Sequence, residues 1–339
     1  MARLLMLSSV ILLSAYVTEQ VHFLQPEYIN KLNEEISTWE AGENFPPDTP
    51  IEYLKGLCGS HGVEAAAKGP FKTKDSNYNS LFHIPETFDA RKKWKRCKTI
   101  GVIRDQGNCG SCWAFGTSGA FSDRLCIATD GEFNELLSAE ELAFCCDSCG
   151  EGCLGGDPIS AWQYFSTNGI VTGGGYDSNQ GCLPYYVPPC RLHGVSAEQE
   201  GACRSQPMER NHRCVKKCYG NTRIDYKENH RYTSDAYYLL PDNIQEDVLA
   251  YGPVEASFFV YDDFVNYKSG VYEKSENASC LGGHAVKLIG WGVEKGIPYW
   301  LCVNSWNENW GYQGTFKIRR GTNECGIDYS MTAGVPVID

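Results

Sequence analysis

The pattern of apolar and polar positions first separates a short N-terminal run from the rest of the chain. Residues Leu4–Ala15 are almost wholly apolar and follow Arg3, a pattern typical of a secretory signal peptide. The run is shorter than the roughly 20 apolar residues that a membrane-spanning helix needs, which disfavours the alternative of a membrane anchor. We therefore assign residues 1–17 to a signal peptide and expect no membrane-bound form.

The next stretch, residues 18–83, has its own pattern. Leu32, Ile36 and Trp39 fall at the i, i+4 and i+7 positions of one helical face. The polar run 72–80 is typical of an exposed, cleavable linker. These features indicate a removable pro-region, and an ordinary N-terminal subdomain is the alternative that the pattern leaves open.

From residue 84 to about residue 240 the pattern predicts helices and long loops. A helix is expected to begin near Cys112, because apolar positions share one helical face beyond it: Ala114, Thr117, Phe121, Leu125 and Ala128. The run Ser138-Ala-Glu-Glu141 is a capping box that opens a second helix. Residues 175–235 are rich in Gly, Pro, Asn and Cys and show little periodicity.

After Pro241 the pattern becomes that of strands. A short helix containing Val248 is expected to end at Gly252-Pro253. Apolar runs separated by Gly and Asn/Asp clusters then predict strands at Val254–Val260, Ala285–Trp291, Tyr299–Val303 and Thr315–Ile318. A helix-rich part followed by a strand-rich part predicts an α+β fold with two lobes and a cleft between them.

Composition narrows the class of protein. The 339-residue chain has 17 cysteines and a net charge of −12. Disulfides persist outside the reducing cytosol, which agrees with export. No strongly basic run exists, so nucleic acid is not an expected partner. Two CxxC pairs, Cys109–Cys112 and Cys146–Cys149, raise a zinc ribbon as an alternative, but its ligand spacing and usual compartment do not fit, and we expect no metal.

The residues with candidate chemistry are a thiol and an imidazole. Cys112 lies at an expected helix start, where the helix dipole lowers a thiol pKa. The amide of Gln106, together with the Cys112 backbone N–H, is suited to an oxyanion hole. His284 begins an apolar run and is a candidate base, Asn304 is placed to orient its ring, and Trp306 to shield that bond. The alternatives are a disulfide-bonded Cys112 and a structural histidine.

At this point the residues match a family. Cys109-Gly-Ser-Cys112-Trp113, with His and Asn far downstream, resembles papain-like cysteine proteases. The resemblance is closer to the cathepsin B-like branch and covers the chain after the signal. It is carried by Leu54-Lys-Gly-Leu-Cys58-Gly, Phe88-Asp-Ala-Arg91, Cys145-Cys146, Cys153-Leu-Gly-Gly156, Tyr185–Cys190, Gly252-Pro-Val254, Tyr267-Lys-Ser-Gly270, Gly290-Trp-Gly292 and Cys325-Gly-Ile327.

This resemblance implies a papain-like fold with a helical left lobe and a β-barrel-like right lobe, the active site lying in the cleft between them. A mature cysteine peptidase is expected over residues 84–339, inhibited by the pro-region 18–83 and needing no cofactor. The implied catalytic residues are Cys112, His284, Asn304 and Gln106. Residues implied in substrate binding are Gly155, Gly156 and Trp306.

The resemblance also implies a set of disulfides. The pairs are Cys97–Cys126, Cys109–Cys153, Cys145–Cys214, Cys146–Cys149, Cys182–Cys218 and Cys190–Cys203. Besides the nucleophile, Cys58, Cys280, Cys302 and Cys325 remain. Cys280 and Cys302 have no counterpart in the family pattern, and we expect them to be either buried thiols or a seventh bridge.

The chain departs from the branch in its occluding loop, about residues 190–203. Two adjacent histidines of this loop bind the substrate's C-terminal carboxylate in the family; here His193 is present and Leu192 replaces the other. Leu192 is thus expected to leave Asp105 without its family partner. The second loop ion pair is expected to be lost as well, since Glu200 and Asn309 take its positions.

Such partly exposed pairs contribute only about 0–1 kcal/mol each, yet that is enough to shift a loop between open and closed states. We therefore expect endopeptidase activity to dominate and carboxydipeptidase activity to be weak. Arg191 is the residue that could still attract a C-terminal carboxylate, so a conventional dipeptidyl carboxypeptidase is the first alternative. A non-catalytic binding protein and a purely structural disulfide scaffold are the others.

Two further positions carry expectations. Ser330 stands where the branch has a glutamate at the base of the second subsite, which predicts apolar or aromatic residues there, because a buried arginine would lack a counter-ion. Asn277-Ala-Ser279 is a glycosylation sequon. We expect an acid-active, secreted monomer, lysosomal or extracellular (the gut lumen included), that acts on proteins and peptides and is inhibited by cystatin-like proteins.

Overall fold

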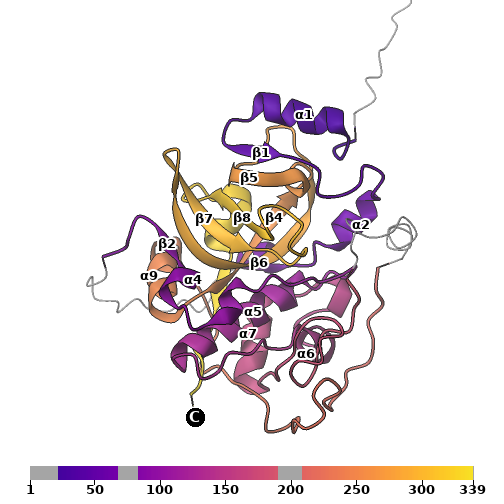
Figure 1. The fold of residues 1–339 in the computed structure, drawn as a ribbon, viewed down its shortest axis with the longest axis vertical. Coiled ribbons are helices and arrows are strands. Elements are labelled where there is room, and N and C mark those ends of the chain that lie inside the picture. Colours follow the sequence, from indigo (N-terminus) through magenta and orange to yellow (C-terminus); the bar gives the residue numbers. More distant parts are fainter. Residues whose placement is uncertain (1–21, 68–82, 190–207, 339) are drawn as a thin grey trace, which may run out of the picture.

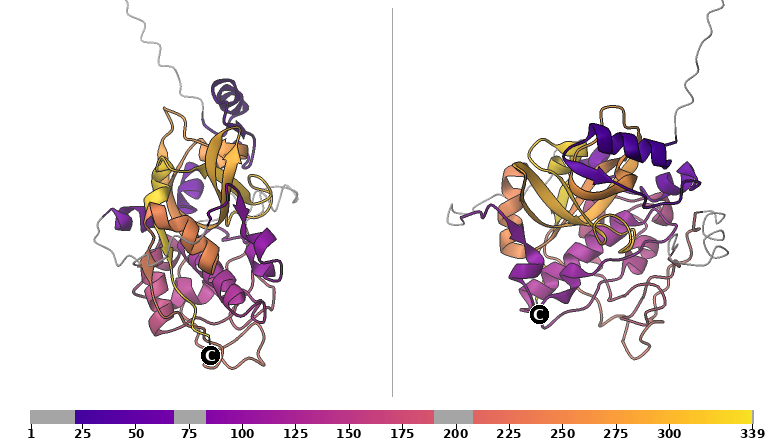
Figure 2. Two further views of the ribbon diagram at one scale, coloured as in Figure 1. Left: turned by 90° about the vertical axis from the view of Figure 1, so that its left-hand side faces the viewer. Right: turned by 45° about the horizontal axis from the view of Figure 1, so that its top comes forward.

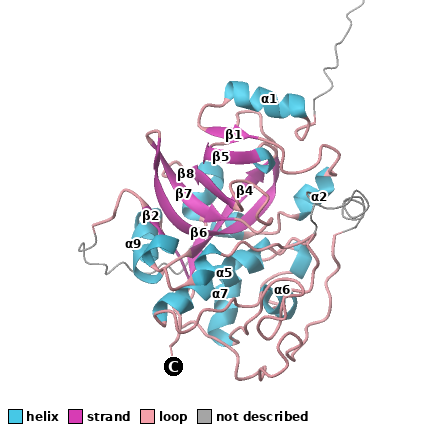
Figure 3. Ribbon diagram, viewed as in Figure 1, coloured by secondary structure: helices cyan, strands magenta, loops and turns pink. Residues whose placement is uncertain are grey.

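The computed structural model describes residues 22–67, 83–189 and 208–338. Its helices lie mainly on one side and its strands on the other, as Figures 1 and 3 show. The expected α+β arrangement is confirmed. The described helices are α1 (Pro26–Glu35), α2 (Ile51–Gly56), α3 (Gly62–Ala66), α4 (Ala90–Lys93), α5 (Cys112–Ala128), α6 (Ala139–Cys145), α7 (Pro158–Thr167) and α9 (Ile244–Tyr251).

Helix α5 is the centre of the helical lobe. Every residue from Cys112 to Cys126 is buried, so the expected single apolar face was too narrow a prediction. Helices α6 and α7 pack on α5 through an apolar cluster that includes Phe121, Trp162 and Phe165. A helix surrounded by protein has no solvent-facing side, which explains its weak amphipathicity.

The predicted capping box at α6 is half realised. Ser138 Oγ accepts a hydrogen bond from the Glu141 backbone N–H at 2.9 Å. The Glu141 carboxylate does not reach back to Ser138; it accepts instead from the Val171 backbone N–H at 2.7 Å. The cap therefore starts the helix and also anchors the segment that follows α7.

The strands form one sheet, with the order β1-β5-β8-β7-β6-β4-β9-β3 and β2 paired to β6. This order leaves the sheet open, so the lobe is curved but not the closed barrel that the resemblance suggested. The strands are β1 (Trp39–Ala41), β2 (Phe88–Asp89), β3 (Tyr237–Tyr238), β4 (Val254–Tyr261), β5 (Tyr267–Tyr272), β6 (Cys280–Glu294), β7 (Ile297–Val303), β8 (Thr315–Arg319) and β9 (Met331–Ala333).

The N-terminal segment lies across the sheet lobe and then descends toward the helical lobe (Figure 2). The predicted helix through Ile36 and Trp39 is wrong in its extent. Helix α1 ends at Glu35, the backbone at Ile36 is extended, and Trp39 belongs to β1, which pairs antiparallel with β5. Pairing with an available sheet edge and burial of the indole outweigh the weak helical pattern at this end.

Five disulfides lie in the described residues, and they are five of the six pairs that the resemblance implies: Cys97–Cys126, Cys109–Cys153, Cys145–Cys214, Cys146–Cys149 and Cys182–Cys218. The pair Cys190–Cys203 falls outside the described residues. Cys280 and Cys302 are both free, so the seventh bridge is not formed. Over the described ranges, none of the helices has the length and apolar character to cross a membrane, and no cluster of potential metal ligands occurs.

Candidate active site

Cys112 is the first residue of α5 and is fully buried. Its thiol is free, so the alternative that makes it half of a disulfide is wrong. The preceding Cys109 is bonded to Cys153, and the hydroxyl of Ser111 lies 2.7 Å from that of Tyr185. These contacts fix the loop that precedes α5. They therefore keep the Cys112 thiol at the N-terminus of the helix, which is the positive end of the helix dipole.

His284 lies on β6 and is held by the residue that follows the neighbouring strand. Its Nε2 is 2.7 Å from Asn304 Oδ1, and the Trp306 ring packs on the imidazole, tilted by 37°, at a centroid distance of 4.6 Å. Strands β6 and β7 are antiparallel partners, and β7 ends at Val303. Their pairing therefore brings Asn304 beside His284 although 20 residues separate them, and Nδ1 is the ring nitrogen left for another partner.

The thiol and the imidazole meet at the junction of the lobes. The backbone N–H of Ala285, next to His284, hydrogen-bonds to the Cys112 thiol and favours its charged form. Helix α5 and β6 pack directly on each other. The nucleophile and base candidates thus come from different lobes, so only the packing of the two lobes brings them together.

Gln106 is buried and its amide has a defined orientation. Its Oε1 accepts from Ser305 Oγ at 2.7 Å, while Nε2 donates to the carbonyl oxygens of Cys109 at 2.7 Å and Leu57 at 3.0 Å. The Leu57 carbonyl oxygen belongs to the N-terminal segment. The amide therefore already binds a peptide carbonyl from another part of the chain, which is the interaction an oxyanion donor makes.

Residues 57–61 of the N-terminal segment fill the cleft over Cys112. The Gly59 backbone N–H donates to Cys112 Sγ at 3.3 Å. Gly59 O accepts from Gly156 N, and His61 N donates to Gly156 O, each at 2.9 Å, in a parallel bridge. A side chain on Gly59 would place its Cβ 1.8 Å from the carbonyl oxygen of Gly110. Only glycine permits this close approach to the nucleophile.

The two glycines expected to bind substrate backbone lie along this segment. Gly156 forms the backbone pair just described, and a Cβ on Gly155 would lie 2.9 Å from His61 Nε2 and 3.0 Å from Gly59 O. The wall is therefore built to receive an extended chain at backbone distance.

Burial under this segment sets the charge state of the pair. It raises the pKa of the Cys112 thiol to about 11 and lowers the pKa of His284 to about 4, although the hydrogen bond to Asn304 acts against the second shift. A neutral thiol and a neutral imidazole are thus the stable forms around pH 7. The nucleophile faces an amide N–H in this arrangement, so the covered site is at rest.

Residues 60–63 of the same segment pack against β4 and the turn at Gly326. Ser60 Oγ lies 2.8 Å from Ser257 Oγ, and Val63 packs where a side chain on Gly326 would be. Ser330, expected at the base of the second subsite, accepts from the Ser257 backbone N–H through its carbonyl at 3.0 Å and is buried. The predicted subsite residue therefore lies next to Ser257, which the N-terminal segment contacts through Ser60.

Glu255 is a buried residue beside this contact that the sequence reasoning missed. Ser257 Oγ donates to its carboxylate at 2.6 Å, and Thr332 Oγ1 donates at 2.5 Å. Burial raises the pKa of this carboxyl to about 8. The only sequence signal was an acid inside an apolar strand, flanked by Val254 and Ala256, and such an acid is unusual at a core position.

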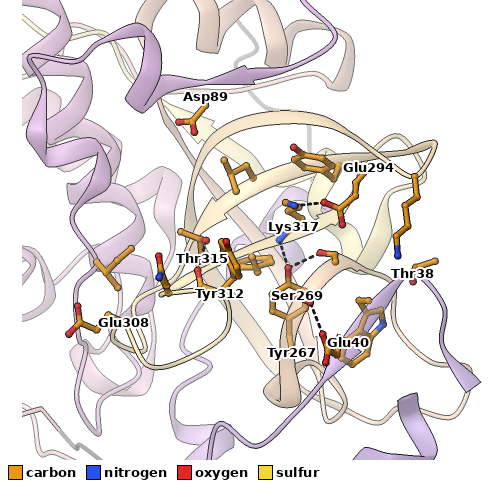
Figure 4. A pocket seen from close by; sticks show the side chains of 18 of the residues that line it. Thr38, Glu40, Asp89, Tyr267, Ser269, Glu294, Glu308, Tyr312, Thr315 and Lys317 are labelled. Carbon is orange, nitrogen blue, oxygen red and sulfur yellow. Dashed lines mark hydrogen bonds and ion pairs between the residues drawn. The ribbon is translucent and has the colours of Figure 1, made fainter. Parts of the chain in front are cut away.

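A second hollow, of about 980 Å³, lies on the sheet lobe, away from these residues. Figure 4 shows its mixed charges: Lys317 pairs with Glu294, and Ser269 donates to Glu40 of the N-terminal segment. Strand β1 forms one side of it. This hollow has no thiol or histidine in its lining and marks an edge of the contact between the N-terminal segment and the sheet.

The remaining predicted positions are placed as follows. The loop residues Leu192, His193, Arg191 and Glu200 lie outside the described residues. Asp105 Oδ1 accepts from the Gly107 backbone N–H at 2.8 Å, and the predicted loss of its family partner falls on Leu192, outside the described residues. Asn309 is exposed, and Asn277 is exposed in the turn between β5 and β6.

Comparison with known proteins agrees with this geometry. Residues 84–335 match the model of the papain family cysteine proteases, and residues 24–64 match that of the peptidase family C1 propeptide. The chain belongs to the papain family of cysteine proteases. It carries a propeptide, and the segment that covers Cys112 is the end of that match.

Within the family, the chain is similar to cathepsin B-like enzymes. It is 46% identical over 290 residues to cathepsin B-like cysteine proteinase 6 of Caenorhabditis elegans, covering 84% of this chain and 75% of the relative. It is 40% identical over 329 residues to a cathepsin B-like cysteine proteinase of Schistosoma japonicum, covering 95% of each. Among solved structures, procathepsin B S9 of Trypanosoma congolense matches with a TM-score of 0.78 and 31% identity, over 94% of this chain and 100% of that one.

Proposed function

We propose that this chain is the zymogen of a cysteine endopeptidase in which Cys112 is the nucleophile and His284 the general base and acid. The observation that carries the proposal is the junction of the lobes. There a free thiol at a helix N-terminus lies beside a histidine whose Nε2 is held by Asn304, and both are covered by one extended segment. Asn304 orients the ring, Trp306 shields the bond, and Gln106 is the oxyanion donor.

The reaction follows from these roles. The Cys112 thiolate attacks the carbonyl carbon of the scissile bond, and the new oxyanion binds the Gln106 amide and the Cys112 backbone N–H. Protonated His284 gives its proton to the leaving amine, and the acyl-enzyme forms. His284 then takes a proton from water, which attacks the thioester and releases the acid. Gly155 and Gly156 bind the substrate backbone on one wall of the cleft.

The propeptide keeps this chemistry off until it leaves. In our proposal residues 1–17 are the signal peptide, 18–83 the inhibitory propeptide and 84–339 the mature enzyme, made in the secretory pathway and acting in a lysosome or outside the cell. Departure of residues 57–61 readmits water to the cleft. The proton of Cys112 then passes to His284, since the ion pair is no longer desolvated and the start of α5 favours the thiolate.

Cleavage at internal bonds is proposed as the main activity. The support is sequence-based: Leu192 replaces a histidine that in the family receives the substrate's C-terminal carboxylate, and Asn309 carries no charge to pair with the loop. Cystatin-like inhibitors are expected to enter the same open cleft. The enzyme is proposed to be a monomer, with a glycan at the exposed Asn277.

The second subsite is proposed to accept apolar or aromatic side chains in acid. Ser330 supplies no charge there. Glu255 hydrogen-bonds to Ser257, and burial in the zymogen raises its pKa to about 8. We propose that it stays buried in the mature enzyme, so that it is neutral at pH 5 and offers an arginine side chain no counter-ion. The preference for apolar residues should therefore be strongest in acid.

The test is product analysis at pH 5 on the acid-matured enzyme. An internally quenched peptide blocked at its C-terminus is compared with the same peptide carrying a free carboxylate, with Cys112→Ala as the inactive control and Leu192→His as the matched loop variant. Faster internal cleavage of the blocked peptide, with dipeptide release gained in Leu192→His, supports the proposal. Successive loss of dipeptides from the free peptide by the unaltered enzyme contradicts it, and cleavage of neither peptide makes the chain non-catalytic.

A further inference from the structure

The described cysteines outside disulfides fall into two groups. Cys302 and Cys325 are buried among apolar side chains of the sheet lobe. The others gather at the cleft: Cys58 in the propeptide, Cys112 beneath it and Cys280 at the start of β6. Cys58 and Cys280 have no part in the proposed reaction, yet they lie on the two sides of the contact that keeps the enzyme at rest.

The backbones that carry Cys58 and Cys280 are in direct contact. The Ser60 N–H donates to Gly283 O at 2.9 Å, and a Cβ on Gly282 would lie only 2.9 Å from Cys58 Cβ. Gly282 stands two residues after Cys280 on β6, at φ +152°. Glycine at this position lets Cys58 approach β6 this closely, and Cys280 lies two strand positions, roughly 6–7 Å, earlier on the strand. A disulfide therefore needs a local shift that brings the Cβ atoms of Cys58 and Cys280 to about 3.5–4.5 Å.

The electrostatics of the thiols agree with this proximity. Burial raises the pKa of Cys58, and negative charge on either Cys112 or Cys280 would raise it further, so both neighbours lie within electrostatic range. The pKa of Cys280 is raised by burial and by Glu64 of the propeptide. Cys280 therefore also faces the docked propeptide.

Access distinguishes the two partners open to Cys58. Cys112 is fully buried, and the Gly59 N–H covers its sulfur. Cys280 is exposed, so a small dissolved disulfide can reach it. Thiol–disulfide exchange needs an accessible attacking thiolate. Oxidation should thus begin at Cys280 and leave the nucleophile intact.

We propose that Cys58 and Cys280 form a disulfide that ties the propeptide across the cleft, so that activation requires reduction in addition to cleavage of the linker. The thiols are reduced in this structure, and glutathione disulfide is the oxidant of the proposed exchange. The Cys280 thiolate attacks glutathione disulfide and releases one glutathione. The Cys58 thiolate then displaces the second glutathione from Cys280, so that two protein thiols and one disulfide become one protein disulfide and two glutathiones.

The consequence for activity rests on the proposed function. The disulfide acts as a latch, because it keeps the propeptide attached to the enzyme after the linker has been cut. Once the linker is cut, an untied propeptide diffuses away. A tied propeptide remains at an effective concentration in the millimolar range and rebinds, which is worth about 10²–10⁴-fold in apparent affinity. The enzyme would then switch on where the medium is both acidic and reducing.

The first measurement maps the bond and does not depend on activity. Full-length zymogen is equilibrated with glutathione disulfide, its remaining thiols are alkylated, and its peptides are mapped by mass spectrometry without reduction. The expected result is a peptide pair joined through Cys58 and Cys280, which is lost in Cys280→Ser. A Cys58–Cys112 pair, a glutathione adduct on Cys280 with no link, or no modification would each overturn the proposal.

The second measurement tests the latch. The oxidised zymogen is cut in the linker by an added protease, and a peptidyl epoxide is used to label Cys112 with and without reductant. Labelling without reductant should be about 10²–10⁴-fold slower than with it, whereas Cys280→Ser, whose exposed position tolerates the change, should label equally fast in both. Equal rates in the unaltered protein would overturn the latch. A Cys58–Cys280 peptide in a protein that cleaves no substrate would leave the tie standing and reject the proposed function.

Discussion

Trp39 is the propeptide residue whose removal should most directly release the active site. It is 5% exposed and is held on β1, which pairs with β5. The indole lies 5.2 Å from the Tyr272 ring and 6.1 Å from the Tyr267 ring, and its N–H donates to the Glu273 carbonyl at 2.9 Å. When the propeptide leaves, all of these contacts are exchanged for water.

The size of the effect follows from that burial. Truncation of a buried tryptophan to alanine costs about 3–5 kcal/mol, and here the cost falls on the docked propeptide, because the indole is solvated once the propeptide has left. Since 1.4 kcal/mol is tenfold in an equilibrium constant, Trp39→Ala should raise the fraction of open zymogen about 10²–10⁴-fold. Trp39→Phe keeps an aromatic ring but loses the indole N–H and its hydrogen bond, worth about 1 kcal/mol or about fivefold, together with part of the buried area, so its effect should stay near tenfold.

The assay is the rate at which a peptidyl epoxide labels Cys112 in intact zymogen at pH 7. If opening is fast compared with labelling, the rate reports the open fraction, up to the limit set by the free mature enzyme. The order Trp39→Ala, then Trp39→Phe, then the unaltered chain is expected. A Trp39→Ala zymogen that labels at the unaltered rate, with unchanged circular dichroism and melting temperature, would refute the claim that β1 holds the propeptide in place.

Three further predictions concern the site and the core. In the mature enzyme, Gln106→Ala should lower kcat about 10²–10³-fold with little change in KM, measured with a fluorogenic peptide; an unaltered kcat would remove Gln106 from the oxyanion hole. In the zymogen, burial raises the pKa of Cys112 to about 11 and lowers that of His284 to about 4, so slow alkylation by iodoacetamide should increase with pH toward 11, whereas the mature enzyme should react already in acid; superimposable pH profiles would contradict this shift. The ion pair of Arg124 and Asp247 is almost fully buried, so Asp247→Asn should reduce the free energy of unfolding by about 3–5 kcal/mol, measured by urea denaturation. A loss below about 1 kcal/mol would refute the claim that Arg124 depends on Asp247 for its charge compensation.

Much of the local structure of this protein could be predicted from neighbouring residues. The start of α5 at Cys112, the cap at Ser138, the end of α9 before Gly252 and the apolar cores of the strands β4, β6, β7 and β8 all depend on interactions within a few positions of the chain. The family also followed from the order of residues alone. These features are local because helix caps and strand periodicity are properties of short segments.

The features that the sequence pattern did not predict depend on contacts between segments that are distant in the chain. Trp39 lies in a strand and not in the predicted helix, because β1 pairs with the edge of β5 and the indole packs against the Tyr272 ring. Glu255 lies beneath the propeptide contact because β4 places it beside Ser257, whose hydroxyl is within 2.8 Å of that of Ser60. Cys280 did not pair with Cys302, and lies instead at the exposed start of β6, two positions before Gly282, which contacts Cys58. Each outcome depends on which surfaces meet when the lobes and the propeptide pack, and a one-dimensional pattern carries no distance between such surfaces.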